Sequence, residues 1–181
     1  MYLEIVNRIE EMRAGRFLEI RESNKGSTLI DAPPRGCAGI YFLYTSYSLA
    51  ELEAVPALPG RAVPIAKLAN AHRRLRHTCV LEQEGFRLVY NGKGGFNEGS
   101  YDLRARILQE ISSNDHRTGS LCIRQSTVND LSKWRFSYVT LDCAAQRAAS
   151  DFGPDWCYDK HATELERCWR LAHGWPLLCR T

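Results

Sequence analysis

Three segments of the chain repeat apolar side chains every three to four residues, the spacing of one helix face. Residues 2–13, 100–111 and 161–174 show this pattern, and we expect an α-helix in each. Their inward-facing apolar positions are Ile5, Ile9 and Met12 in the first, Leu103, Ile107 and Ile111 in the second, and Leu165, Cys168, Trp169 and Ala172 in the third. Gly174, with Pro176 soon after it, is typical of a helix end, so the last helix should stop there.

Five shorter runs are rich in aromatic, β-branched or alternating apolar side chains, which favour β-strands. They are residues 17–23, 37–45, 86–92, 120–125 and 134–141. The run CAGIYFLYT at 37–45 is apolar and aromatic along its length, so we expect it to be a buried strand.

Glycine and proline separate these elements. Residues 46–64 hold three prolines and a glycine and predict a surface loop. The sequence NGKGG at 91–95 predicts a turn, because asparagine and glycine tolerate a positive φ. No regular pattern covers residues 142–160. We therefore predict one α+β domain over residues 1–181, with a small, mostly antiparallel central sheet of three to four strands flanked by helices.

The composition indicates which broad class of protein this is, but it does not indicate a particular reaction or ligand. The 181 residues carry 24 Lys and Arg against 21 Asp and Glu, so the net charge is only +3. No apolar run approaches the roughly 18 residues that cross a bilayer, and the first residues lack the pattern of a signal peptide. The seven cysteines are scattered and odd in number, which is typical of free thiols in a reducing compartment. We expect a cytoplasmic protein with no membrane contact.

The basic charge gathers in one part of the chain. Residues 61–81 contain five basic side chains and no acidic one; these are Arg61, Lys67, Arg73, Arg74 and Arg76. Residues 66–77 predict a helix that brings Arg73, Arg76 and His77 within one turn of each other. Such a face is either solvated or in contact with phosphate groups, and both interpretations stay open.

Four short motifs follow one another in a fixed order along the chain. They are Gly39-Ile40-Tyr41 on a strand, Tyr90-x-Gly92 on a strand, Leu103-x-x-Arg106 on a helix, and Leu165-Glu166-x-x-Trp169 on the last helix. In this order the chain resembles the GIY-YIG nuclease superfamily. The resemblance spans residues 37–178, and leaves residues 1–36 as an N-terminal extension and residues 46–86 as an insertion.

The resemblance implies a role for each matching residue. Tyr41 would orient or deprotonate the attacking water, although a free phenol has a pKa near 10. Arg106 would donate paired hydrogen bonds to a phosphate oxygen. Glu166 would hold Mg²⁺, or Mn²⁺ as a substitute, since these hard ions accept one carboxylate plus waters. Tyr90 and Lys93 would hold the phosphate or the water network.

Some positions depart from the pattern of the family. A long insertion separates Tyr41 from Tyr90, although loop closure costs only about 0.6 kcal/mol per doubling of length. Asn91 replaces the family's isoleucine, Glu110 stands where a histidine is often found one turn after the arginine, and Cys179 replaces an asparagine. Gly92 is expected to let the backbone approach the scissile phosphate, together with Gly94.

Two positions have a competitor nearby in the sequence. Arg104 lies two residues from Arg106 and would point to a different face of the helix. Glu164 lies two residues from Glu166, but Glu166 with Trp169 matches the spacing of the family better.

The resemblance implies a Mg²⁺-dependent endonuclease that hydrolyses DNA phosphodiester bonds. The compact layout is similar to that of the type II restriction endonucleases of this family, so we expect a site-specific enzyme that acts on double-stranded DNA. Lys67, Arg73, Arg74 and Arg76 are the candidate DNA contacts. One module cuts one strand, which favours a homodimer for double-strand cleavage. A structure-specific or repair nuclease, a nuclease toxin, and a non-catalytic nucleic-acid-binding domain of the same fold remain as alternatives.

Overall fold

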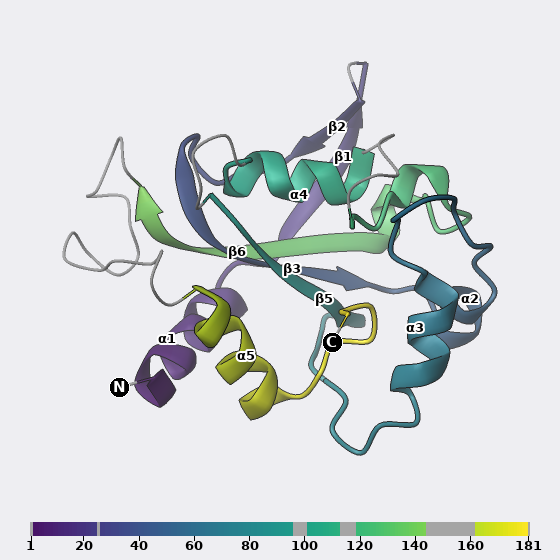
Figure 1. Ribbon diagram of the computed structural model, residues 1–181. Helices are drawn as coiled ribbons and strands as arrows, with labels where there is room; N and C mark the ends of the chain where they lie inside the picture. Colours follow the sequence, from purple (N-terminus) through teal and green to yellow (C-terminus); the bar gives the residue numbers. More distant parts are fainter. Residues whose placement is uncertain (1, 25, 96–100, 113–118, 144–161, 181) are drawn as a thin grey trace.

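An antiparallel sheet crosses the molecule, and helices lie on both of its faces (Figure 1). The computed structural model describes residues 2–24, 26–95, 101–112, 119–143 and 162–180. The α-helices of this part are α1 (Tyr2–Ala14), α2 (Leu49–Glu53), α3 (Ile65–His72), α4 (Leu103–Ser112) and α5 (Ala162–His173). The strands are β1 (Leu18–Ser23), β2 (Gly26–Leu29), β3 (Cys37–Thr45), β4 (Glu82–Gln83), β5 (Phe86–Gly94) and β6 (Trp134–Cys143).

Strand β3 lies at the centre of the sheet. The strand order is β2-β1-β6-β3-β5-β4, and every neighbouring pair is antiparallel. Each of the nine residues of β3 is buried, as its apolar sequence predicted, because the strand has a neighbour on each side and helices above and below. Strands β3 and β5 pair directly, so the two tyrosine motifs lie side by side despite the insertion between them.

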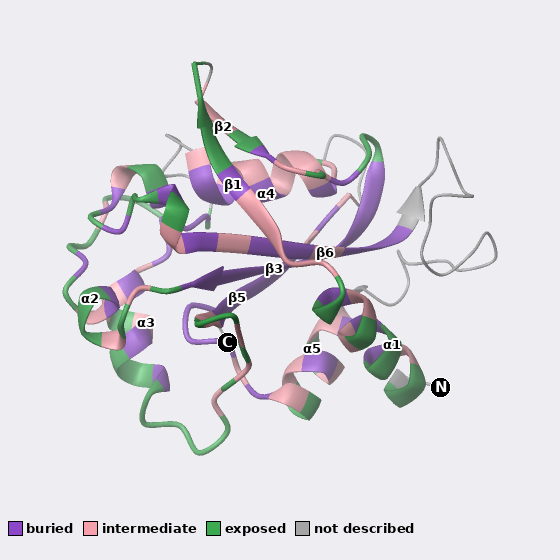
Figure 2. Ribbon diagram, turned by 180° about the vertical axis from the view of Figure 1, so that it is seen from behind, coloured by how far each residue is buried: buried purple, intermediate pink, exposed green. Residues whose placement is uncertain are grey.

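The two faces of the sheet carry separate apolar cores. Helix α4 packs on one face through Leu103, Ile107 and Ile111. Helices α1 and α5 pack on the other face, where Ile9 and Trp169 are fully buried. Figure 2 shows the buried central strands between these layers, while residues 21–24 of β1 and just after it are exposed.

The structure confirms the α+β class and the predicted helices at 2–13 and 100–111, with the described part of the predicted 161–174 helix. The predicted sheet of three to four strands is wrong, because the described residues form six strands. The short strand β2 was not predicted, because its four residues, GSTL, have a weak apolar pattern. The turn expected at 91–95 is also wrong, because β5 continues through Gly94.

The strand predicted at 120–125 is a further correction. Residues Ile123–Gln125 form a 3₁₀ turn, and Cys122 before it has a φ of 50°. The backbone N–H of Leu121 donates to the side chain of Glu110 instead of to another strand. A backbone used in this way cannot join a sheet, however apolar its side chains are.

The insertion at 46–86 is more ordered than a surface loop. Helix α2 begins with a capping box, in which Ser48 and Glu51 bond to each other's backbone N–H groups. The predicted 66–77 helix ends at His72, whose buried ring bonds to the carbonyl of Leu177 at 2.9 Å. Arg73 and the residues after it therefore leave the helix, and the expected cluster on one helical turn does not form.

The cysteines differ from expectation at one position. Cys37 is disulfide-bonded, whereas Cys79, Cys122, Cys168 and Cys179 are free. The cysteine pattern thus no longer supports a reducing compartment, and the cytoplasmic location stays a prediction. None of the described helices has the length and apolar character that a bilayer crossing requires.

Candidate active site

Strands β3 and β5 bring two tyrosines to the face that α4 covers. Tyr41 lies opposite Gly92, and Tyr90 lies opposite Leu43 two register positions along. A bulge at Val89 follows, which re-aims the side chains of β5. The two tyrosine rings lie 6.1 Å apart between centroids, so both hydroxyls reach the same region.

Glycines make this close packing possible. A Cβ at Gly92 would lie 2.5 Å from the hydroxyl oxygen of Tyr41, and a Cβ at Gly94 would lie 2.9 Å from the Cβ of Arg106. The space above both glycines is therefore filled by Tyr41 and α4. Their expected role of giving a phosphate close access to the backbone is replaced here by a role in packing.

A carboxylate that the sequence treated as a departure lies at the centre of this group. Glu110 is fully buried, and its Oε1 accepts the hydroxyl of Tyr41 at 2.7 Å and lies 2.9 Å from Nη2 of Arg106. The hydroxyl of Tyr90 lies 3.5 Å from the same oxygen. The second oxygen, Oε2, accepts the backbone N–H of Leu121 at 2.7 Å. Three elements and one loop thus converge on a single side chain.

The electrostatics keep both tyrosines protonated. Burial, and then the negative charge of Glu110, raise the pKa of Tyr41 well above its usual value. Tyr90 has a raised pKa for the same two leading reasons. Burial also raises the pKa of Glu110, against the opposing effect of Arg106 and the other donors. In the free protein Tyr41 is a neutral phenol whose hydroxyl donates a hydrogen bond to Glu110.

The helix brings Arg106, and not Arg104, to the tyrosines. The guanidinium of Arg106 is about a quarter exposed, and it also donates to Gln109 one turn away. Arg104 instead lines a pocket of about 270 Å³ with Arg35 and Asp102 on another side of α4. Arg106 therefore extends from the buried Tyr41–Glu110 pair to the protein surface.

Glu166 and Lys93 lie on the opposite face of β5. Lys93 on β5 donates to Thr163 of α5 at 2.5 Å. One turn further along α5, Glu166 pairs with Arg170 at 2.5 Å, and both side chains are mostly buried. Glu164 is exposed. The structure therefore brings Glu166, and not Glu164, toward β5.

Arg170 and Asn91 link Glu166 to the strand. The Nε of Arg170 donates to Oδ1 of Asn91 at 2.9 Å, and the thiol of Cys179 lies 3.1 Å from the same oxygen. The charge of Glu166 adds to the causes that raise the pKa of Tyr90, after burial, Glu110 and Cys179. The pKa of Tyr90 is thus raised by both carboxylates, Glu110 on one face of β5 and Glu166 on the other.

The donor set around Glu166 fits a hydrated divalent ion held by one carboxylate. The Oε1 atom pairs with Arg170, while Oε2 has no hydrogen-bond partner among the described residues. Nearby, the Nδ2 of Asn91 is buried without a partner, so a donor stands ready for an oxygen of a ligand. No group of three or more metal-binding side chains occurs in the described part, so waters would complete the shell of Mg²⁺ or Mn²⁺.

The candidate DNA contacts lie away from this group, at the end of the sheet where α2 and α3 lie side by side (Figure 1). Lys67 is exposed on α3, and Arg74 and Arg76 are exposed in the turn after it. Arg73 is held by Glu53 at 3.0 Å. Lys67, Arg74 and Arg76 have no ion pair with any described residue, so all three are available to a phosphate.

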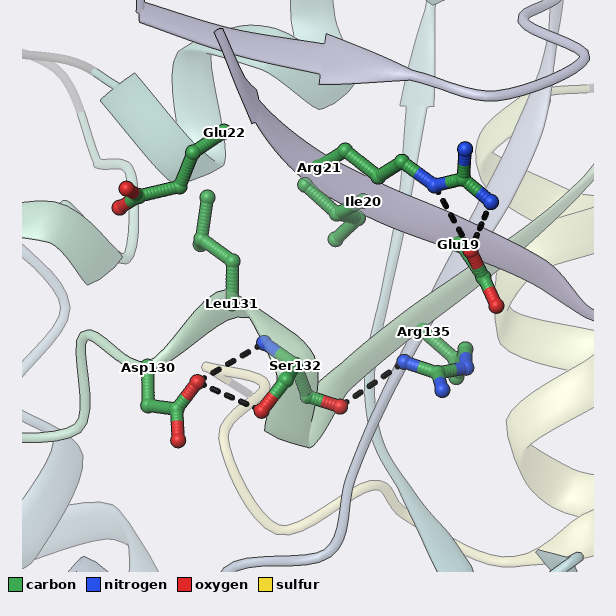
Figure 3. Close-up of a pocket in the computed structure, with 8 residues that line it drawn as sticks. All are labelled: Glu19, Ile20, Arg21, Glu22, Asp130, Leu131, Ser132 and Arg135. Carbon is green, nitrogen blue, oxygen red and sulfur yellow. Dashed lines mark hydrogen bonds and ion pairs between the residues drawn. The ribbon is translucent and has the colours of Figure 1, made fainter.

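A larger pocket lies elsewhere. It has a volume of about 530 Å³ between β1 and the residues that lead into β6 (Figure 3). Its charged groups bond to their own neighbours: Arg21 to Glu19, and Asp130 to Ser132. The charged groups named here are thus already paired with each other or with their neighbours.

Sequence reasoning missed Glu110 and Arg170 as members of the site. A signal for Glu110 was present, since it falls on the same helix face as Leu103, Ile107 and Ile111, where an acid is out of place. Arg170 has no such signal, because an arginine four residues after a glutamate is ordinary on a helix surface.

No protein-family model, no curated protein and no solved structure matches the chain. The resemblance to GIY-YIG nucleases therefore rests on the residues described above.

Proposed function

We propose that the protein is a Mg²⁺-dependent endonuclease that cuts double-stranded DNA at specific sites. The observation that carries the proposal is the meeting of Tyr41, Tyr90 and Arg106 around one buried carboxylate. These residues come from separate motifs, and each motif lies on the kind of element that the family resemblance implies. Any one motif alone would be unremarkable, but their convergence in space supports the joint interpretation.

The chain's own groups suit the steps of phosphodiester hydrolysis. Arg106 reaches the surface and can donate two parallel N–H groups to two nonbridging phosphate oxygens, which neutralises charge as the transition state forms. Tyr41 can orient the attacking water through its hydroxyl. Glu166 lies on the other face of β5 from Tyr41 and Arg106, so a Mg²⁺ or Mn²⁺ ion held there would supply charge neutralisation to the part of the DNA backbone that reaches that face. Lys93 lies on the same side of β5 as Glu166 and adds positive charge there.

The test is cleavage of supercoiled plasmid by the purified protein with Mg²⁺ and with EDTA. We expect cleavage with Mg²⁺ alone, and discrete fragments whose sequenced ends share one site. A smear, or a preference for branched DNA, would favour a structure-specific nuclease or a toxin instead. The ratio of nicked to linear product reports whether two copies act together, as the proposed homodimer would.

Glu166→Gln should abolish Mg²⁺-dependent cleavage, with a loss of about 10²-fold or more, because the amide cannot replace the charged ligand. Binding to a DNA duplex, followed by fluorescence anisotropy without Mg²⁺, should stay within about twofold. Glu164→Gln is the matched control, since it removes the same charge two residues away at an exposed position. Full cleavage by Glu166→Gln would remove this residue from the metal site.

A non-catalytic nucleic-acid-binding domain is the second candidate. The observation in its favour is that Tyr41 is fully buried and Glu166 already pairs with Arg170. A protein that binds duplex DNA but leaves every plasmid intact with Mg²⁺ and with Mn²⁺ would support this candidate over the nuclease.

The turn after α3 is the proposed DNA contact outside the site. Each phosphate contact contributes about 0.9 to the slope of log affinity against log salt. Arg74→Gln with Arg76→Gln should therefore flatten this slope by about 1 to 2 units in anisotropy titrations over a range of salt concentrations.

Arg21→Gln with Arg124→Gln is the matched control for this double variant. It removes the same charge from two exposed arginines that pair with Glu19 and Glu22 at the far edge of the sheet. An unchanged slope in the Arg74 and Arg76 variant would exclude this turn from the DNA interface.

A further inference from the structure

Glu110 is the most enclosed ionisable group of the site. Its side chain has no exposed surface, and it lies between α4, β3, β5 and the loop at Leu121. A buried carboxylate is stable only where charged or hydrogen-bonding partners compensate for lost water. Here the compensation comes from the backbone N–H of Leu121 and from three groups that the proposed reaction uses, Tyr41, Tyr90 and Arg106.

The two carboxylate oxygens have different tasks. Oε2 accepts the backbone N–H of Leu121, which fixes the side chain to a loop that cannot shift independently of the core. Oε1 faces Tyr41, Tyr90 and Arg106 together. Oε2 thus holds the side chain in place, and Oε1 accepts hydrogen bonds from several groups at once.

We propose that Glu110 is a positioning residue that takes the proton of Tyr41 during hydrolysis, an inference that rests on the proposed nuclease function. The water oxygen forms a bond to phosphorus while its proton passes to the hydroxyl oxygen of Tyr41. The original hydroxyl proton of Tyr41 passes to Oε1 of Glu110 along the 2.7 Å hydrogen bond. The phosphorus–leaving-oxygen bond breaks, and the leaving oxygen takes a proton from solvent.

This relay answers the main difficulty of a tyrosine base. A free tyrosinate is disfavoured here, because burial and the charge of Glu110 both raise the pKa of Tyr41. Tyr41 therefore cannot begin as a base on its own. Tyr41 can instead accept the proton of water while it gives its own proton to Glu110, so that no tyrosinate forms. This requires that the carboxyl group hydrogen-bonded to Tyr41 has a pKa nearer neutrality.

Substrate binding would strengthen the acceptor. Arg106 pairs with Glu110 at 2.9 Å in the free protein, and this pairing holds down the pKa of the carboxyl group. Once Arg106 turns its guanidinium toward a phosphate, Glu110 loses that counter-charge in a buried place. Its affinity for a proton rises at the moment when the reaction releases one.

The remaining ionisable groups around Glu110 are few. Tyr41 faces it from β3, Tyr90 from β5, and Arg106 from its own helix. Cys179 senses its charge from the C-terminal segment and is a neutral thiol, since burial raises its pKa to about 12. Arg124, in the turn at Ile123–Gln125, is partly exposed and pairs with Glu22. Among these described groups Glu110 is the one that would give an acidic limb, and its loss in Glu110→Gln distinguishes it from a limb caused by Glu166.

The test compares wild-type protein with Glu110→Gln, and follows plasmid cleavage over a range of pH. In the wild type the rate should rise with pH as Glu110 loses its proton. Glu110→Gln keeps the shape and an acceptor for Tyr41 but has no basic group, so its rate should fall about 10²-fold and this acidic limb should vanish. Affinity for uncleaved duplex should change by less than about threefold. Gln109→Ala, which removes another hydrogen-bond partner of Arg106, should keep the limb.

The outcomes separate the two proposals. Active wild-type protein with an unchanged limb and rate in Glu110→Gln overturns the relay alone. Inactive wild-type protein overturns the nuclease proposal and the relay with it. Should circular dichroism show that Glu110→Gln does not fold, Glu110→Asp is the test. The shorter carboxylate keeps the limb but lowers the rate about 10-fold, and a wild-type rate in that variant also overturns the relay.

Discussion

If the protein cuts DNA as proposed, Arg106→Lys should slow cleavage by about 10² to 10³-fold, the loss typical when one preorganised donor to a transition state is removed. Lysine keeps the positive charge that Glu110 needs, so the buried carboxylate is not left alone. It lacks the planar fork that binds two oxygens in parallel, and the lost activity therefore reports geometry and not charge. The measurement is the single-turnover rate of plasmid nicking, with thermal unfolding by circular dichroism alongside.

Arg104→Lys is the control for this variant. Arg104 lies on the same helix, but it lines a separate pocket on another side of α4. Its replacement should leave the rate within about twofold. Equal losses in the two variants would mean that α4 contributes only general positive charge, and that Arg106 has no special place in the site.

Gly39→Ala lowers the free energy of unfolding by about 3 kcal/mol, near the upper end for an overpacked core position. A Cβ at Gly39 would lie 2.1 Å from the carbonyl oxygen of Val139 in the neighbouring strand and 2.8 Å from Cδ2 of Leu103. The first of these atoms belongs to the backbone and cannot turn away. For a domain of this size the unfolding midpoint should drop by roughly 6–12 °C, which differential scanning calorimetry measures.

Gly119→Ala adds the same methyl group where there is room. The nearest atom to a Cβ at Gly119 is Nη1 of Arg180 at 3.9 Å. Its unfolding free energy should stay within about 0.5 kcal/mol of the wild type. A normal midpoint for Gly39→Ala would show that β3 and β6 can separate at this point, against the register described here.

The elements that the sequence predicted well share one property: the apolar pattern matches burial on a known face. Strand β3 and helix α4 are examples, since their apolar residues fill the core that they share. The segment at 120–125 has the same kind of residues but forms no strand. The backbone N–H of Leu121 donates to Glu110, a residue outside the segment, instead of to another strand. No local pattern in the sequence can reveal such a partner.

In the candidate site, too, some residues could be predicted from the sequence and others depend on tertiary contacts. The motif order predicted Tyr41, Tyr90 and Arg106 together, and the structure brings them together. The placement of Glu166 on the other face of β5 could not be predicted, because it depends on the path of α5 across the sheet. Glu110 did leave a signal, its place on the apolar face of α4, but a glutamate one turn after an arginine is usually a solvated ion pair, and that more common interpretation concealed its role.

The segment at 46–86 and residues 174–180 are joined by direct bonds. His72 bonds to Leu177, and the backbones of His77 and Cys79 bond to that of Trp175. Just beyond the segment, Leu178 bonds to Val89 of β5. The insertion also contributes buried side chains to the core that holds Tyr41. It is therefore a structural part of the domain and not a detachable cassette. Any attempt to exchange it for the corresponding segment of another protein has to transfer these contacts as well, or the edge of β5 loses its cover.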